Sequence, residues 1–482
     1  AYAFNQPLNE WDVSNVNDMV RLFHGASAFN QLIDEWDVSN VTDMDQMFNG
    51  ASAFNQPLNE WNVSQVSTMD QMFYGASAFN QPLNEWNVSQ VVLMGWMFNG
   101  ASAFNQSISD WDVSKINDMV LMFNGASAFN HPINEWDVSQ VTDMGLMFSG
   151  ASAFNQPIND WDVSQATDIS GMFYDASAFN QPLNEWNISK VHKMGWIFDG
   201  AYAFNQPLTG WNISGVNDMG WLFHKAFSFN QTISGWNVSQ VHYMYRMFDG
   251  ASSFNQPIDK WDVSTVHNMR GMFHGASAFN QPINEWDVSR VIDMNGMFSG
   301  ASVFNQTINE WEVSRVRDMS FMFHKAHAFN HCLGAWEALT SDRNVKMNDI
   351  FKSSGCISTS LSEGIWCNNN CPGSNCTNDD SFYLNGKKHQ DCNWVAKKPV
   401  KRCSRNDRKT KQKVKEYCAL ACDLRCSCKN SKKPFKSDGS VLQCRHVDTM
   451  VQCNEEATSK VFKGNFVADL CPKKCGICVV EE

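Results

Sequence analysis

Apolar residues recur along the first two thirds of the chain with a period of 25 residues. Phe4, Trp11 and Phe23 each return in every copy, up to residues 329, 336 and 323, without one insertion. The chain therefore holds thirteen complete copies and a degenerate fourteenth. Such a period predicts a solenoid, because stacked copies can bury apolar side chains that a single copy would leave exposed.

Within one copy, the pattern predicts a short strand followed by a short helix. Trp11 and Val13 alternate with polar residues, which favours a half-buried strand over residues 8–13. Ser14 stands where a helix N-cap belongs, and apolar residues at three- and four-residue steps predict a helix of about ten residues after it. Gly25 supplies the helix stop in ten of the thirteen copies. The predicted fold class is an α/β repeat solenoid with a parallel sheet.

Two further residue types recur at fixed positions of the repeat and should stack in columns along the solenoid. We expect them to have structural roles and not to bind ligands. The Asn that begins at Asn5 recurs to Asn330, and we expect its stacked amides to bond turn backbone groups. The methionine stripe, for example Met44 and Met47, is expected to fill the core.

The repeat, written FNQPLNEWDVSxVxDMxxMFxGASA, resembles that of the BspA-like leucine-rich-repeat surface proteins over residues 1 to about 355. The resemblance implies a curved, leucine-rich-repeat-like solenoid on a cell-surface or secreted protein, used for adhesion or partner binding. It implies no catalytic residue and identifies no ligand.

The stack is expected to end after residue 331 with a cap over residues 332–366. Met347, Ile350 and Phe351 lie three residues late relative to the repeat, and Cys332 and Cys356 flank this deviation. These two cysteines could pair and hold the cap.

All sixteen cysteines lie between Cys332 and Cys478, which predicts a disulfide framework and a secreted or cell-surface protein. We divide the remainder into a basic module, 367–426, and a second module, 427–482. The latter resembles ShK-type modules through its CxxxCxxC ending, whereas residues 382–403 resemble a cysteine module of secreted diatom proteins. The six cysteines assigned to the ShK-like module are Cys428, Cys444, Cys453, Cys471, Cys475 and Cys478. Connectivity stays open.

Charge divides the chain in the same place. Residues 1–331 hold 12 Lys/Arg against 33 Asp/Glu, and residues 332–482 hold 25 against 17. Opposite signs suggest two partners, or self-association of the two regions. Two acidic columns are candidate sites for Ca²⁺ or a basic partner, with a solvated surface as the simpler interpretation. Their members are Glu10, Asp12, Glu35, Asp37, Glu60, Glu85, Asp110, Asp112, Glu135, Asp137, Asp160 and Asp162.

A basic run over residues 387–436 is the second candidate site. It suits an anionic extracellular polysaccharide or a mineral surface, and not nucleic acid, since the module is disulfide-rich. The candidate residues are Lys387, Lys388, Trp394, Lys397, Lys398, Lys401 and Arg402.

The sequence shows no GxSxG, P-loop, Rossmann or HExxH motif, so we expect no enzyme and no cofactor. No apolar run approaches the length of a membrane span. The chain starts inside a repeat without a signal-peptide pattern, which suggests a mature product or a fragment. Sequons such as Asn62 and Asn87 suggest a glycoprotein. The favoured function is extracellular adhesion or matrix binding to a polysaccharide, mineral or protein ligand. A self-assembling structural cell-wall protein and a receptor ectodomain are the alternatives.

Overall fold

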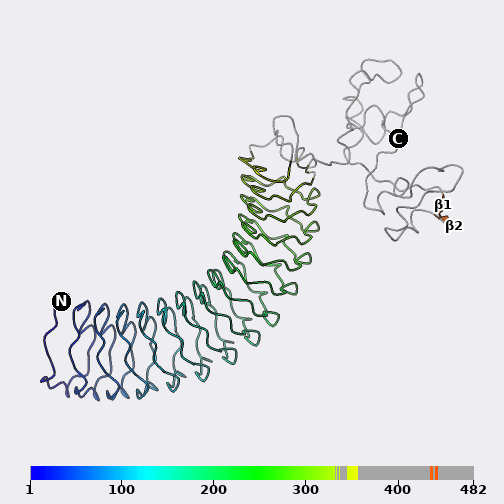
Figure 1. The fold of residues 1–482 in the computed structure, drawn as a ribbon. Helices are drawn as coiled ribbons and strands as arrows, with labels where there is room; N and C mark the ends of the chain where they lie inside the picture. The colour runs from blue at the N-terminus through cyan, green and yellow to red at the C-terminus, as the bar shows by residue number, and fades with distance from the viewer. Residues whose placement is uncertain are drawn as a thin grey trace, which may run out of the picture. The chain divides into compact units, whose positions relative to one another are not determined.

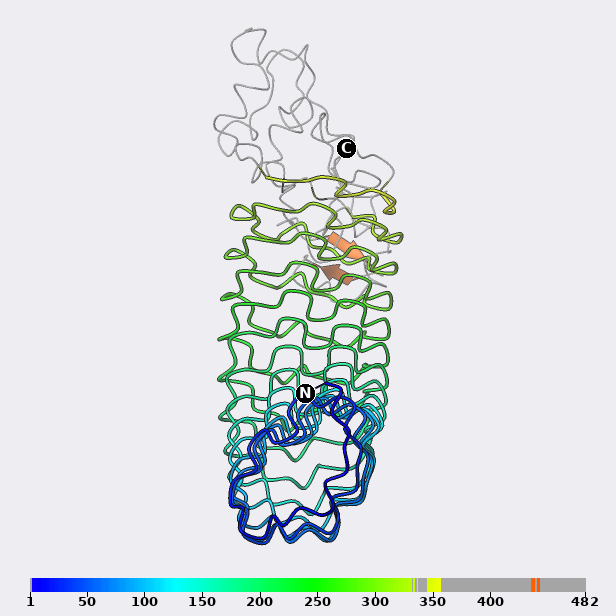
Figure 2. The same cartoon turned by 90° about the vertical axis from the view of Figure 1, so that its left-hand side faces the viewer.

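The computed structural model describes residues 2–331, 333, 336 and 345–356, together with the backbone of two short strands near the C-terminus. The chain forms two compact units, Ala1–Asn369 and Asn370–Glu482. In the first unit, successive 25-residue copies stack as coils in a curved row (Figure 1). Figure 2 shows the N-terminal coils end on, each tracing a loop around the core. The predicted repeat solenoid is therefore confirmed.

In the second unit, the described strands are β1 (Phe435–Ser437) and β2 (Ser440–Leu442). They pair antiparallel, with Phe435 opposite Leu442. The basic module and the ShK-like module otherwise lie outside the described residues.

The strand and the helix predicted for each copy are both wrong. Copies 1–13 are built from tight turns, in which an N–H bonds the carbonyl three residues earlier, as in Trp11 to Leu8 (3.0 Å) and Leu22 to Met19 (3.2 Å). An α-helix requires bonds to the fourth residue back. Left-handed residues prevent such a run, because φ is +58° at Arg21 and +68° at Gly25.

Backbone bonds run between coils instead of along them. We number positions in every copy by the first copy, so position 18 is Asp18 and Asp43. The N–H groups of positions 19, 21 and 23 donate to carbonyls of the next coil, as in Met19 to Asp43 (2.9 Å). Position 18 forms parallel bridges between coils, as in Asp18 with Asp43. The predicted parallel relation between copies thus occurs, but as isolated bridges at another segment.

Aromatic columns fill the core, as predicted. Phe29 and Phe54 stack with ring centroids 5.8 Å apart, and Trp36 and Trp61 with centroids 6.4 Å apart. The Trp36 indole N–H donates to the Leu8 carbonyl of the preceding coil at 3.1 Å. Trp11 departs from the prediction: it is 55% exposed, since no described coil lies on its other side. The methionines of the predicted stripe are fully buried, which confirms their place in the core.

The asparagine column also has the predicted structural role. Asn5 Oδ1 accepts the Asn30 N–H (2.9 Å) and the Gln31 side-chain amide (2.9 Å), and this pattern recurs along the stack. The sequons at Asn105, Asn230 and Asn305 lie in this column, and each of these residues bonds a neighbouring coil in the same way.

The last described coil follows the predicted three-residue shift. The Phe323 N–H donates to the Ile350 carbonyl at 2.8 Å, and the Phe323 and Phe351 rings stack 5.6 Å apart. Cys356 is buried and disulfide-bonded, whereas the predicted pairing with Cys332 lies outside the described residues. In the part of the chain described, no helix is long and apolar enough to cross a membrane.

Candidate binding face

The two acidic columns do not share a sheet face, because their residues form turns and not strands. All twelve predicted carboxylates are solvent-exposed. In the position-12 column, Asp12 Oδ1 accepts both the Ser14 hydroxyl (2.6 Å) and the Ser14 N–H (3.0 Å). These two bonds lower the pKa of Asp12, the hydroxyl bond more strongly. The position-12 carboxylates therefore stabilise their own turn, and binding of Ca²⁺ by these columns stays a prediction.

The described residues contain no cluster of three or more His, Cys, Asp or Glu side chains arranged to hold a metal ion. The predicted polyanion-binding residues, from Lys387 to Arg402, all lie outside the described part of the chain.

A different face varies strongly between copies. We define the variable face as positions 18, 20, 21 and 24 of each copy. Position 21, for example, is Arg21, Gln46, Trp96, Leu121 or Gly171 in different copies, whereas positions 4, 5, 11 and 23 do not change. The core sets the invariant positions, so it leaves the variable face free to differ.

Contacts between coils join these positions into one surface. The ring centroids of Tyr74 and Trp96 lie 6.2 Å apart, and Lys193 Nζ forms an ion pair with Asp168 Oδ2 at 2.9 Å. Large apolar side chains are also exposed here, at Tyr74, Leu93, Tyr174, Trp196, Tyr243 and Phe321. Exposed aromatic side chains of this kind are typical of binding surfaces.

Position 21 holds its side chains in a strained backbone. Its φ lies between +53° and +61° in the ten copies where it is not glycine, and these include Trp96, Trp196 and Trp221. A left-handed conformation costs a residue with a Cβ roughly 1–2 kcal/mol. Glycine is accepted here in three copies, Gly171, Gly271 and Gly296, so the fold does not require the larger residues. Strain retained without a structural need points to function.

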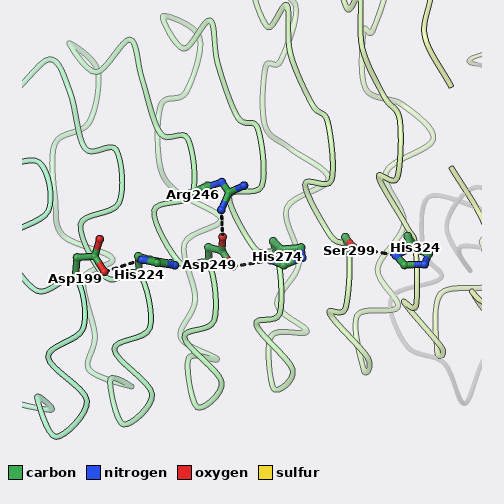
Figure 3. Close-up of polar contacts among 7 residues, drawn as sticks. All are labelled: Asp199, His224, Arg246, Asp249, His274, Ser299 and His324. Atoms are coloured by element: carbon green, nitrogen blue, oxygen red, sulfur yellow. Dashed lines mark hydrogen bonds and ion pairs between the residues drawn. The ribbon is translucent and has the colours of Figure 1, made fainter. Parts of the chain in front are cut away.

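A polar row crosses the C-terminal half of the face at position 24 (Figure 3). His224 Nδ1 lies 2.6 Å from Asp199 Oδ1, and His274 Nδ1 lies 2.6 Å from Asp249 Oδ1. Both carboxylates are buried, so each is satisfied by a partner on a neighbouring coil. Asp249 also accepts from Arg246 Nη1 at 3.1 Å. These bonds fix the orientation of Arg246 and His274.

Two acidic residues at position 18, Asp143 and Asp218, differ from Asp12 in the direction of their pKa shift. Burial raises the pKa of Asp143, and the neighbouring Asp168 and Asp118 add to the rise, against the Gly145 N–H that it accepts at 2.8 Å. Burial likewise raises the pKa of Asp218, despite hydrogen bonds from Gly220 and Tyr245. Burial thus disfavours the charged form of Asp143 and Asp218 on the variable face, whereas hydrogen bonds favour the charged form of Asp12.

Sequence reasoning missed this face. The available signal was the contrast between positions that change from copy to copy and positions that do not, which needs no structure to see. The acidic columns were predicted as the candidate site instead, because their charge recurs at fixed positions of the repeat.

The family model described as "Mycoplasma protein of unknown function, DUF285" matches residues 1–111, 94–209, 181–270 and 256–363. These matches together span the whole described solenoid. No curated protein matches the chain.

Proposed function

Because the chain belongs to the DUF285 family of repeat proteins, which has no assigned activity, we propose a function from the solenoid itself. We infer that it is a non-catalytic extracellular adhesion or matrix-binding protein, which recognises its ligand through the variable face. The observation that carries this is the column of bulky residues kept at positive φ on that face.

Two further features support an extracellular binding role. The sequence resembles BspA-like leucine-rich-repeat surface proteins, and its sixteen cysteines are confined to one region, as in secreted proteins. A solenoid also suits binding, since a row of coils presents an extended surface that can vary without disturbing the core.

The test measures binding of the full chain to immobilised neutral, carboxylated and sulfated polysaccharides. The face variant combines Trp196→Gly with Tyr243→Ser, and the control combines Glu85→Gln with Glu135→Gln in the position-10 column. Both Trp196 and Tyr243 are more than 40% exposed, so their loss should leave the core intact. Replacing Trp196, at φ +59°, by glycine also removes the strain of a left-handed residue, so the melting temperature should be unchanged or higher.

We expect the face variant to weaken polysaccharide binding at least about tenfold, which is the loss of roughly 1.4 kcal/mol. The control should bind within about twofold of the unaltered chain, as expected for exposed charges. The reverse pattern would assign binding to the acidic columns. Salt-sensitive self-association without binding to any polysaccharide would favour the self-assembling cell-wall protein, for which the opposite charges of the two regions are the argument.

A further inference from the structure

A pocket of about 250 Å³ opens on the variable face across copies 10–13. It exists because position 21 is glycine in two consecutive copies, Gly271 and Gly296, between the large side chains of Arg246 and Phe321. All residues that line it come from positions 20, 21 and 24. Pockets for drug-sized ligands span roughly 300–1,000 Å³, so this one suits a single sugar residue or a small acid.

Hydrogen-bond donors dominate the lining. Arg246 and Arg270 bring two guanidinium groups, and Asn295 and Ser299 add an amide and a hydroxyl. Arg270 is exposed and forms no ion pair among the described residues. A guanidinium presents a fork of donors that matches an oxyanion, and it stays charged at every physiological pH.

The pocket wall is held in place from behind. Asp249, which is buried, accepts from Arg246 at 3.1 Å and from His274 at 2.6 Å (Figure 3). The Arg246 guanidinium also lies 4.7 Å from the Trp221 ring centroid, within cation–π range. An arginine fixed by such partners loses little conformational entropy when it binds a ligand.

Only one of the two pocket guanidinium groups is paired with a carboxylate among the described residues. Asp249 offsets one guanidinium, and the acidic Asp318 is turned toward the Asn295 amide at 3.4 Å. His324, at the C-terminal end, has its pKa lowered, first by burial and then by Lys325 and Lys352. The second guanidinium, that of Arg270, therefore remains available to an anion.

We propose that this pocket binds one acidic sugar residue of an extracellular polysaccharide. Arg270 and Arg246 bind its carboxylate or sulfate, Asn295 and Ser299 bond its hydroxyls, and Phe321 packs against the apolar side of the ring. Phe321 is 40% exposed at the pocket edge and is suited to that contact. This inference rests on the proposed function, since the pocket is part of the variable face.

The experiment titrates the full chain with galacturonate, galactose 6-sulfate and neutral galactose, using calorimetry and ligand-observed NMR. We expect one or both acidic sugars to bind, and neutral galactose to bind at least tenfold more weakly. Which acidic sugar binds more tightly distinguishes a carboxylated from a sulfated source. Equal binding of galactose, or binding of none of the three sugars, would overturn the proposal.

Two variants locate the site. Arg270→Gln removes the exposed guanidinium and should weaken acidic-sugar binding at least tenfold. Gly296→Leu fills the pocket, and the fold should accept it, because Leu146 occupies the same position in copy 6 at φ +57°. Gln71→Leu makes a similar change at position 21 of copy 3, far along the chain from the pocket, and should leave affinity within twofold.

Unchanged affinity in Gly296→Leu, with a cooperative melting transition showing that the variant is folded, would place the sugar elsewhere and overturn the assignment. The Trp196 and Tyr243 variants distinguish this failure from that of the proposed function, because neither residue lines the pocket. If polysaccharide binding depends on those two residues but not on Arg270 or Gly296, the variable face binds without the pocket.

Discussion

Trp161 and Trp196 are the same amino acid in neighbouring copies, and the solenoid uses them in opposite ways. Trp161 is 3% exposed, lies 6.3 Å from the Phe148 ring, and donates its indole N–H to the Ile133 carbonyl at 3.0 Å. Trp196 is 42% exposed and sits at φ +59°. The first stabilises the stack, whereas the second imposes backbone strain on it. Residue type alone therefore does not separate core from binding surface, but position in the repeat does.

The largest expected effect is the difference in stability when each tryptophan is truncated. Trp161→Ala should cost roughly 3–5 kcal/mol, because it empties a buried aromatic site. Trp196→Ala should change stability by no more than about 0.5 kcal/mol, as for most exposed sites. Hydrogen exchange resolved by copy is the measurement, since coils of a solenoid can open locally. Similar losses of protection in the two variants would show that the variable face belongs to the core.

A smaller effect is expected in the asparagine column. Asn155 Oδ1 accepts the Asn180 N–H at 2.9 Å and the Gln181 amide at 3.0 Å. Asn155→Ala should cost roughly 1–3 kcal/mol, because a partly buried N–H loses its acceptor. The exchange rate of the Asn180 amide reports this directly, and Asn155→Asp, which keeps an acceptor oxygen, is the control. If Asn180 exchanges at the same rate in all three proteins, the column does not join the coils.

The smallest expected effect concerns the pH dependence of stability, to which two carboxylates, Asp162 and Asp143, should contribute with opposite signs. The pKa of Asp162 is lowered, first by the Ser164 hydroxyl. Its contribution to folding stability is therefore present above the pKa of the unfolded state, near 3.8, and is lost as pH falls through the pKa of the folded state. The pKa of Asp143 is raised by burial, so its contribution is present at low pH and is lost as pH rises through the folded value.

Melting temperatures of Asp162→Asn and Asp143→Asn, each compared with the unaltered chain, should therefore move in opposite directions as pH rises from about 3 to 6. The melting temperature of the variant minus that of the unaltered chain should become more negative with rising pH for Asp162→Asn and more positive for Asp143→Asn. A shared sign would mean that the position-12 column and the variable face provide the same environment.

The sequence predicted the parts of the fold that repeat identically. The period, the buried Phe, Trp and Met columns, the asparagine bonds and the three-residue shift near Ile350 all follow from spacing. The helix did not form, because Arg21 and its equivalents adopt positive φ, whereas glycine, the residue type that most favours this conformation, stands at position 21 in only three of thirteen copies. The pocket was not predictable from one copy, since it arises from two glycines 25 residues apart.

The bonds between coils have a consequence for how such a protein can change its length. Each coil contacts its neighbours through the same positions, as in Trp36 to Leu8 and Trp61 to Ile33. Deleting residues 76–100 would therefore set copy 3 against copy 5 with equivalent partners. One copy of 25 residues is encoded by 75 nucleotides, three for each residue. Tandem duplication or loss of such a unit in the gene can thus lengthen or shorten the solenoid. Such events outside copies 10–13 would leave the four coils that build the pocket intact.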